Sequence, residues 1–112
     1  MIPTIIESPF KGETGSDEEY ARNVRYLDRC IRDCLDRGET PYASHKMIPG
    51  ALDDRIPEER ALGIAAGLVW RRLAHKRVFY IDHGMSPGMT AAMALYEREH
   101  LTYVTRSIGA EP

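Results

Sequence analysis

The sequence has no excess of positive charge, since 15 lysine and arginine residues face 17 aspartate and glutamate residues and give the 112-residue chain a formal net charge of −2. Proteins that bind a nucleic-acid backbone carry a basic surplus, so a nucleic-acid polymer is not expected as a partner. The sequence lacks the run of ~18 apolar residues that a membrane-spanning helix needs, and its start, MIPTIIESPF, lacks the basic segment of a signal peptide. We therefore expect a cytoplasmic protein with no membrane partner.

Cysteine is also scarce. Cys30 and Cys34 lie four positions apart in a segment with strong helical periodicity. One helical turn puts them on neighbouring faces, which is a poor setting for a disulfide, and two ligands are too few for a zinc site. We expect two reduced thiols packed in or near the core, as in a reducing compartment.

Short apolar runs alternate with longer segments of helical periodicity. Strands are predicted over residues 3–8, 40–44, 77–82 and 101–106. Helices are predicted to begin after the capping residues Ser16 and Ser86 and at Pro57, with a long loop over residues 45–56. Strands that alternate with helices imply a parallel sheet with right-handed crossovers. We therefore expect one α/β domain over residues 1–112, with a four-stranded parallel sheet in the order 2-1-3-4.

Polar residues gather where the predicted strands end. They are Glu7, Ser8, Ser44, His45, Asp82, His83 and Arg106. Ligands of open parallel sheets bind at the carboxyl ends of the strands, so this edge is the expected site. Asp82 is a candidate to orient a ribose hydroxyl or to act as an acid or base, and capping of the next loop is the alternative. His45 could carry protons, stack on a ring, or do neither.

Two loops are candidates for binding an anion. ESPFKGETG precedes a helix start, where backbone N–H groups meet anions, and its Lys11 adds a positive charge. MSPGM holds Ser86 at the start of the third helix. Neither loop is a GxGxxG or Walker motif, and a plain turn is the alternative at each. We expect no metal and no cofactor.

The second helix contains two glycines and ends in a run of positive charge. Gly63 and Gly67 lie one turn apart, where each costs roughly 1 kcal/mol of helix propensity, so a close approach to a neighbour is the expected reason. The charge run is interpreted as a solvated helix end. It consists of Arg71, Arg72, Lys76 and Arg77.

Several segments taken together resemble a known family. IIESPFKG, the NVRY that begins at Asn23, GETPYASH, LDDRIPEERALGIAAGL and VFYIDHGMSPGM are similar to a small phage and bacterial branch of the nucleoside 2-deoxyribosyltransferase superfamily, over residues 5–106. The resemblance implies a Rossmann-like three-layer domain that hydrolyses or transfers the N-glycosidic bond of a nucleoside or nucleotide. Related transferases are oligomers, so it also implies a homodimer or a larger homo-oligomer.

The resemblance assigns roles to several positions. The first loop would lie near the base or the 5′ end, Asp82 would contact the sugar, and Ser86 with Gly88 would receive a 5′-phosphate. With their neighbours, the candidate substrate-binding residues are Ser8, Pro9, Phe10, Lys11, Gly12, Asn23, His45, Asp82, Ser86, Gly88 and Met89.

The catalytic glutamate that this family needs on the last helix is absent. The positions after SPGM are Thr90, Ala91 and Ala92, and Glu97 would be displaced along the helix by roughly 7–10 Å. Three explanations follow: a natural binder, an engineered inactive variant, or catalysis by another carboxylate. The candidate carboxylates are Asp82, Glu59 and Glu7, although Glu59 also suits a helix start. The functional hypotheses are therefore an N-glycosidase or transferase, a nucleotide-binding module without turnover, and an interaction protein with a vestigial pocket.

Overall fold

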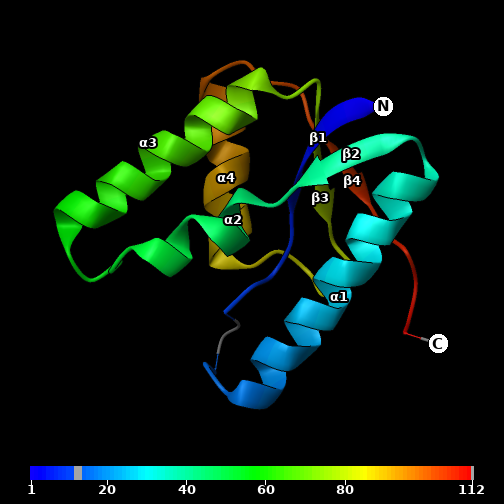
Figure 1. The fold of residues 1–112 in the computed structure, drawn as a ribbon, viewed down its shortest axis with the longest axis horizontal. Helices are drawn as coiled ribbons and strands as arrows, with labels where there is room; N and C mark the ends of the chain where they lie inside the picture. Colours follow the sequence, from blue (N-terminus) through cyan, green and yellow to red (C-terminus); the bar gives the residue numbers. More distant parts are fainter. Residues whose placement is uncertain (12–13, 112) are drawn as a thin grey trace.

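Four parallel strands form one sheet in the order β2-β1-β3-β4, which confirms the predicted topology. The computed structural model describes residues 1–11 and 14–111 (Figure 1). In chain order the elements are β1 (Ile2–Glu7), α1 (Asp17–Asp36), β2 (Glu39–Tyr42), α2 (Ser44–Met47), the 3₁₀ helix η1 (Pro49–Ala51), α3 (Pro57–Leu73), β3 (Lys76–Tyr80), α4 (Pro87–Arg98) and β4 (Val104–Arg106). Helix α1 covers one face of the sheet, and α3 and α4 lie on the other.

Local sequence signals set the helix ends. The Ser16 hydroxyl accepts a hydrogen bond from the backbone N–H of Glu19 at 3.1 Å, and Gly38 follows α1 with a φ of +79°. The Ser86 hydroxyl caps α4 in the same way, through the N–H of Met89. These caps confirm the predicted helix starts.

Alternating side chains of β1 and β3 divide the core between the two faces. Ile6, Val78 and Tyr80 pack against α1, where both cysteines are buried and free, as expected. Phe79 faces α4 on the other side. Glu7 lies beside Phe79 in the strand register, so its carboxylate points toward α3 and α4.

The structure differs from the sequence-based expectations in three respects. The predicted strands are too long, because β2 ends at Tyr42, β3 ends at Tyr80 and β4 begins only at Val104. The predicted loop over residues 45–56 contains most of α2 and all of η1.

The charge run at the end of α3 is solvated only in part, at Arg72 and Lys76. Arg77 is buried and donates to the carbonyls of Arg71 and Ala74 at 2.9 Å each. Arg77 thus satisfies two carbonyls at the carboxyl end of α3 that the helix itself leaves without a partner.

The glycines of α3 do make room for neighbours. A Cβ on Gly63 would lie 3.0 Å from the side chain of Leu52, in the segment after η1. A Cβ on Gly67 would lie 2.6 Å from Nη1 of Arg71. The close approach is therefore to the chain's own loop at Gly63 and to an arginine of the same helix at Gly67. No helix in the described part of the chain is long and apolar enough to cross a membrane.

Candidate ligand pocket

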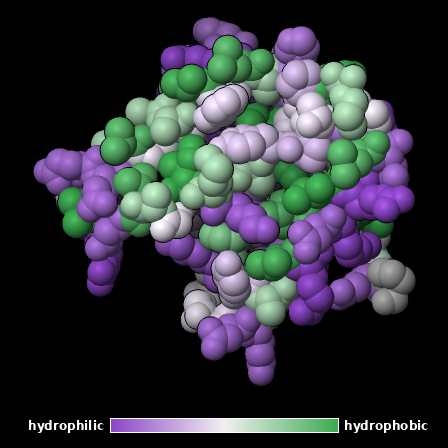
Figure 2. Space-filling model, viewed as in Figure 1, coloured by the Kyte–Doolittle hydropathy of each residue, from purple (hydrophilic) through white to green (hydrophobic). Residues whose placement is uncertain are grey.

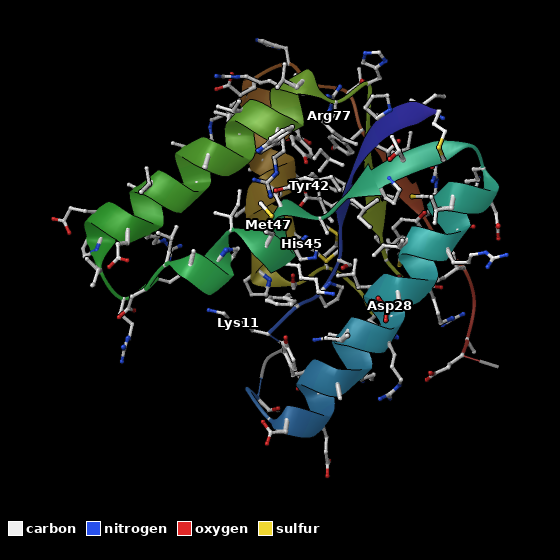
Figure 3. All side chains as sticks on the ribbon, viewed as in Figure 1. Lys11, Asp28, Tyr42, His45, Met47 and Arg77 are labelled. Atoms are coloured by element: carbon white, nitrogen blue, oxygen red, sulfur yellow. The ribbon has the colours of Figure 1, made fainter. Side chains whose placement is uncertain are left out.

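A cavity of about 1070 Å³ opens at the carboxyl end of β1. Its wall comes from the loop after β1, the first turns of α1, the α2–η1 segment, the inner side of α3 and the start of α4. Ligand pockets typically enclose roughly 300–1000 Å³, so the space suits a small organic molecule. Figure 3 shows His45 at the start of α2 and Lys11 on the loop after β1, two of the residues that line it.

The carboxylate of Glu7 is held in the cavity wall by α3 and α4. Nε and Nη2 of Arg71 donate to it at 3.0 and 3.1 Å, and the Tyr96 hydroxyl donates to Oε2 as well. Burial alone would lower the pKa of Arg71, but the hydrogen bonds and the charge of Glu7 outweigh it and raise that pKa. Burial, followed by the charge of Glu7, raises the pKa of Tyr96. Arg71 therefore stays charged and Tyr96 stays protonated.

Three buried polar atoms in this wall have no hydrogen-bond partner among the described residues: Asn23 Oδ1, Ser44 Oγ and His45 Nδ1. The Asn23 amide nitrogen donates to the Phe10 carbonyl at 3.1 Å, which leaves its oxygen as an unused acceptor. His45 Nε2 lies 3.1 Å from the Ser8 hydroxyl, which leaves Nδ1. An unmet buried polar group costs ~1–3 kcal/mol, so a bound ligand that satisfied these atoms would gain affinity from them.

His45 is neutral in this environment. Burial, opposed by the charge of Glu7 and assisted by that of Arg71, lowers the pKa of its imidazole. A neutral imidazole has one donor and one acceptor nitrogen, so Nδ1 takes whichever role Nε2 does not take toward Ser8. The Phe10 ring meets His45 edge-on, with ring centroids 5.9 Å apart, and gives this side of the cavity an aromatic surface.

The start of α4 forms the facing wall and supplies no acid. Gly88, Met89, Ala91 and Ala92 lie on it, and no described α4 residue that lines the cavity carries a carboxylate. The Ser86 hydroxyl is also there but already accepts the N–H of Met89 at 3.2 Å. The absence of the glutamate at positions 90–92 therefore leaves an apolar surface where the resemblance implies a catalytic group.

Most of the candidate site residues meet in this cavity. Those that line it are Glu7, Ser8, Pro9, Phe10, Lys11, Asn23, His45, Ser86, Gly88 and Met89. Gly12 lies outside the described residues. Lys11 is exposed and forms an ion pair with Asp54 at 3.3 Å, across the cavity mouth from β1.

Two candidate carboxylates lie elsewhere. Neither Asp82 nor Glu59 is among the described residues of the cavity wall. Asp82 faces α1 and the C-terminal segment, where it accepts from the Tyr26 hydroxyl at 2.6 Å and from the N–H of Ile108 at 3.0 Å. Burial alone would raise the pKa of Asp82, but these hydrogen bonds outweigh it and lower that pKa. Glu59 accepts from the N–H of Asp53 at 3.3 Å, at the start of α3.

Arg106 also leaves the predicted edge. Its guanidinium crosses to the start of β2 and donates to both oxygens of Glu39 at 2.6 Å. Conversely, Arg71 lines the cavity and Tyr96 holds Glu7 in its wall, although neither was a candidate site residue from the sequence. One signal for Arg71 was present: Gly67, four residues earlier, is one helical turn away and leaves space for a side chain that folds back.

No group of three or more histidine, cysteine, aspartate or glutamate side chains in the described ranges is placed to hold a metal ion. No curated protein and no solved structure matches this chain. One protein family does match, over residues 3–106, and its description is "Domain of unknown function (DUF7768)". Because the match covers nearly the whole chain, the protein belongs to the DUF7768 family.

Proposed function

We propose that this protein binds a nucleoside or nucleotide in the cavity and does not break its N-glycosidic bond. The observation that carries the proposal is the set of three unpartnered buried polar atoms, on Asn23, Ser44 and His45. Buried polar groups ordinarily have hydrogen-bond partners, so these atoms call for a polar ligand. The resemblance to deoxyribosyltransferases supplies the class of ligand, a base attached to a sugar.

The base belongs on the side of Asn23 and His45. The Asn23 amide nitrogen is engaged by Phe10, so Oδ1 is the atom that is left for a ligand. An amide oxygen can only accept, and it therefore requires an N–H or O–H of the ligand. Nucleobases offer amino and ring N–H donors, and their flat faces suit the aromatic surface of Phe10. Neutral His45 and Ser44 then complete the hydrogen bonds to the ring or to the sugar.

A 5′-phosphate fits the start of α4. Helix N-termini bind anions through free N–H groups and the helix dipole, and Gly88 lets an anion come close to the backbone there. Arg22 also lines the cavity and contributes positive charge. These features support a monophosphate as the preferred ligand over the free nucleoside.

The absence of turnover follows from the carboxylates. Glycosidic cleavage through an oxocarbenium-like state uses carboxylates on the two sides of the scissile bond. In this cavity Glu7 is engaged by Arg71 and Tyr96, and the α4 wall offers none. The other two carboxylates of the described wall are engaged as well, Asp54 by Lys11 and Glu19 by the Thr14 hydroxyl. A carboxylate with its oxygens already hydrogen-bonded is a poor nucleophile.

An N-glycosidase or transferase is the second candidate. Its support is that Glu7 is buried in the wall of the cavity, at the end of β1, where a ligand can reach it. The reaction would require Arg71 to release Glu7 when substrate binds. In that case conversion of Glu7 to glutamine would abolish release of the base.

The test is a pair of assays on one sample. Nucleosides and their monophosphates are screened by thermal shift, and the best ligands are then incubated and analysed for free base by chromatography. The proposal predicts a saturable rise in Tm and no free base. Release of base that disappears in Glu7→Gln would establish the enzyme instead, and no shift with any ligand would refute both candidates.

The proposal includes a homodimer and a cytoplasmic location. The two free, buried thiols are compatible with a reducing compartment. Light scattering at micromolar concentration tests the dimer, and a monomeric mass would contradict it.

A further inference from the structure

Helix α3 carries apolar side chains on its outer side, away from the cavity. The inner side meets the cavity and η1 through Gly63 and Gly67. On the outer side Leu62, Val69 and Leu73 have exposed fractions of 61%, 53% and 63%. The outer side of a surface helix is normally polar. Figure 2 shows apolar side chains spread over this helix at the surface.

The outer residues fall on one stripe. Positions three and four residues apart lie on the same side of a helix, so an exposed row runs along α3 from its first turn to its last. We call this row the outer stripe of α3, and it consists of Glu58, Ala61, Leu62, Ala65, Val69, Arg72 and Leu73. All seven residues are exposed, and all except Glu58 and Arg72 are apolar.

We propose that the outer stripe of α3 is the contact between two copies of this chain, with the two α3 helices packed antiparallel about a two-fold axis at Ala65. This inference specifies the homodimer and does not depend on which ligand the cavity binds. Monomeric proteins rarely leave an apolar row of this length in water. A surface that pairs with itself about a two-fold axis is the commonest route to a dimer.

The charges at the two ends of the stripe select a second copy as the occupant. Glu58 lies seven residues before Ala65 and Arg72 lies seven residues after it. At 1.5 Å per residue, each charge is ~10 Å from the proposed axis, on opposite sides. An antiparallel pair therefore brings Glu58 next to Arg72 of the partner subunit, twice by symmetry. A parallel pair would oppose like charges at both ends.

The side chains between the charges also suit close packing. Ala61 and Ala65 are small, so the helices can approach to the ~8–10 Å that packed helices adopt. Leu62 and Val69 then fill the space on either side of the axis. Glu58 has no ion pair within the described residues, whereas Arg72 shares its charge with Glu99 at the edge of the stripe, at 2.7 Å.

The first test places a charge on the axis. Ala65→Glu puts two carboxylates against each other in the dimer, while glutamate is a good helix former at an exposed position of the monomer. We expect the mass by light scattering at micromolar concentration to fall by half. The matched control is Ala94→Glu, at an exposed alanine of α4 outside the stripe, which should stay dimeric. A monomeric wild type, or a dimeric Ala65→Glu, would overturn the inference.

The second test reads the antiparallel register. Glu58→Arg and Arg72→Glu each break both symmetric ion pairs, and each should raise the dimer Kd roughly 2–30-fold, the range that two exposed pairs give. The double variant restores opposite charges and should recover the wild-type Kd. Glu99→Gln controls for the internal partner of Arg72: it frees the Arg72 guanidinium for the partner subunit, so the Kd should not rise. A double variant no tighter than either single variant would exclude this pairing.

The dimer and the ligand are measured separately. The cavity lies on the inner side of α3, so the Ala65→Glu monomer should keep the thermal shift with the best ligand. A wrong dimer surface leaves the ligand shifts intact and the mass of Ala65→Glu at the dimer value. A wrong ligand proposal leaves the wild type dimeric with no shift.

Discussion

The carboxylate of Glu7 and the guanidinium of Arg71 form a two-pronged ion pair in the wall of the cavity, with donor–acceptor distances of 3.0 and 3.1 Å. Only 4% and 13% of the two side chains is exposed. The pair ties β1 to α3, and Tyr96 adds α4 through a further hydrogen bond. The ion pair stabilises the ligand-binding edge of the sheet. It also engages the Glu7 carboxylate, which cleavage of a glycosidic bond would need.

Breaking this pair on one side should destabilise the protein strongly. Arg71→Met leaves the Glu7 charge buried without a counter-charge, and we expect the free energy of unfolding to fall by about 3–5 kcal/mol in urea denaturation. The double variant Glu7→Gln with Arg71→Met should regain most of that loss, because no charge is left unpaired. Arg32→Met removes an exposed pair with Asp36 and should cost under about 1 kcal/mol. A small effect of Arg71→Met would mean that water reaches Glu7.

Removing an unpartnered hydroxyl should have opposite effects on stability and on binding. Ser44→Ala deletes a buried oxygen that has no hydrogen bond in the free protein, so we expect about 1 kcal/mol of added stability without ligand. The same change should weaken the thermal shift produced by the best nucleotide. Ser107→Ala, at an exposed position outside the cavity, is the matched control for both measurements. Lower stability without ligand would show that Ser44 has a partner after all.

Asp82→Asn should reduce stability without reducing affinity. Its carboxylate accepts from Tyr26 and from the backbone of Ile108, away from the cavity, and hydrogen bonds to a charged group are worth about 1.5–3 kcal/mol each. We expect a lower free energy of unfolding and a ligand Kd within about twofold of the wild type, measured by titration calorimetry. A folded variant that no longer binds would mean that Asp82 contacts the sugar, as the family resemblance implies.

The ion pair of Glu39 with Arg106 should make the free energy of unfolding depend on pH in the acidic range. The hydrogen bonds from Arg106, opposed by burial and assisted by Lys76, lower the pKa of Glu39 from 4.5 to about 2. A depressed pKa in the folded state means that the contribution is fully present above about pH 4.5 and is lost as the pH falls toward 2. Wild type should therefore lose more stability than Glu39→Gln across this window in urea denaturation. Equal slopes would contradict the shift.

The sequence was sufficient for the architecture because its signals are local. The caps at Ser16 and Ser86 and the positive φ at Gly38 depend on neighbours a few residues away. The alternation of strands and helices then restricts the sheet to parallel, right-handed arrangements. That in turn places Glu7, Ser8 and His45 at one edge, and it makes the absence of an acid at Thr90–Ala92 visible from the sequence.

The tertiary structure decided which side chains at that edge share the cavity. Arg71 and Arg72 are adjacent and look alike in sequence, yet one pairs with Glu7, 64 residues away, and the other with the half-buried Glu99. Asp82 follows the third strand, which ends at Tyr80, and it turns toward α1 and not toward the cavity. The physical reason is that alternation along a strand separates its side chains into two faces, but the partner that each one meets there depends on packing across layers, which short-range periodicity does not encode.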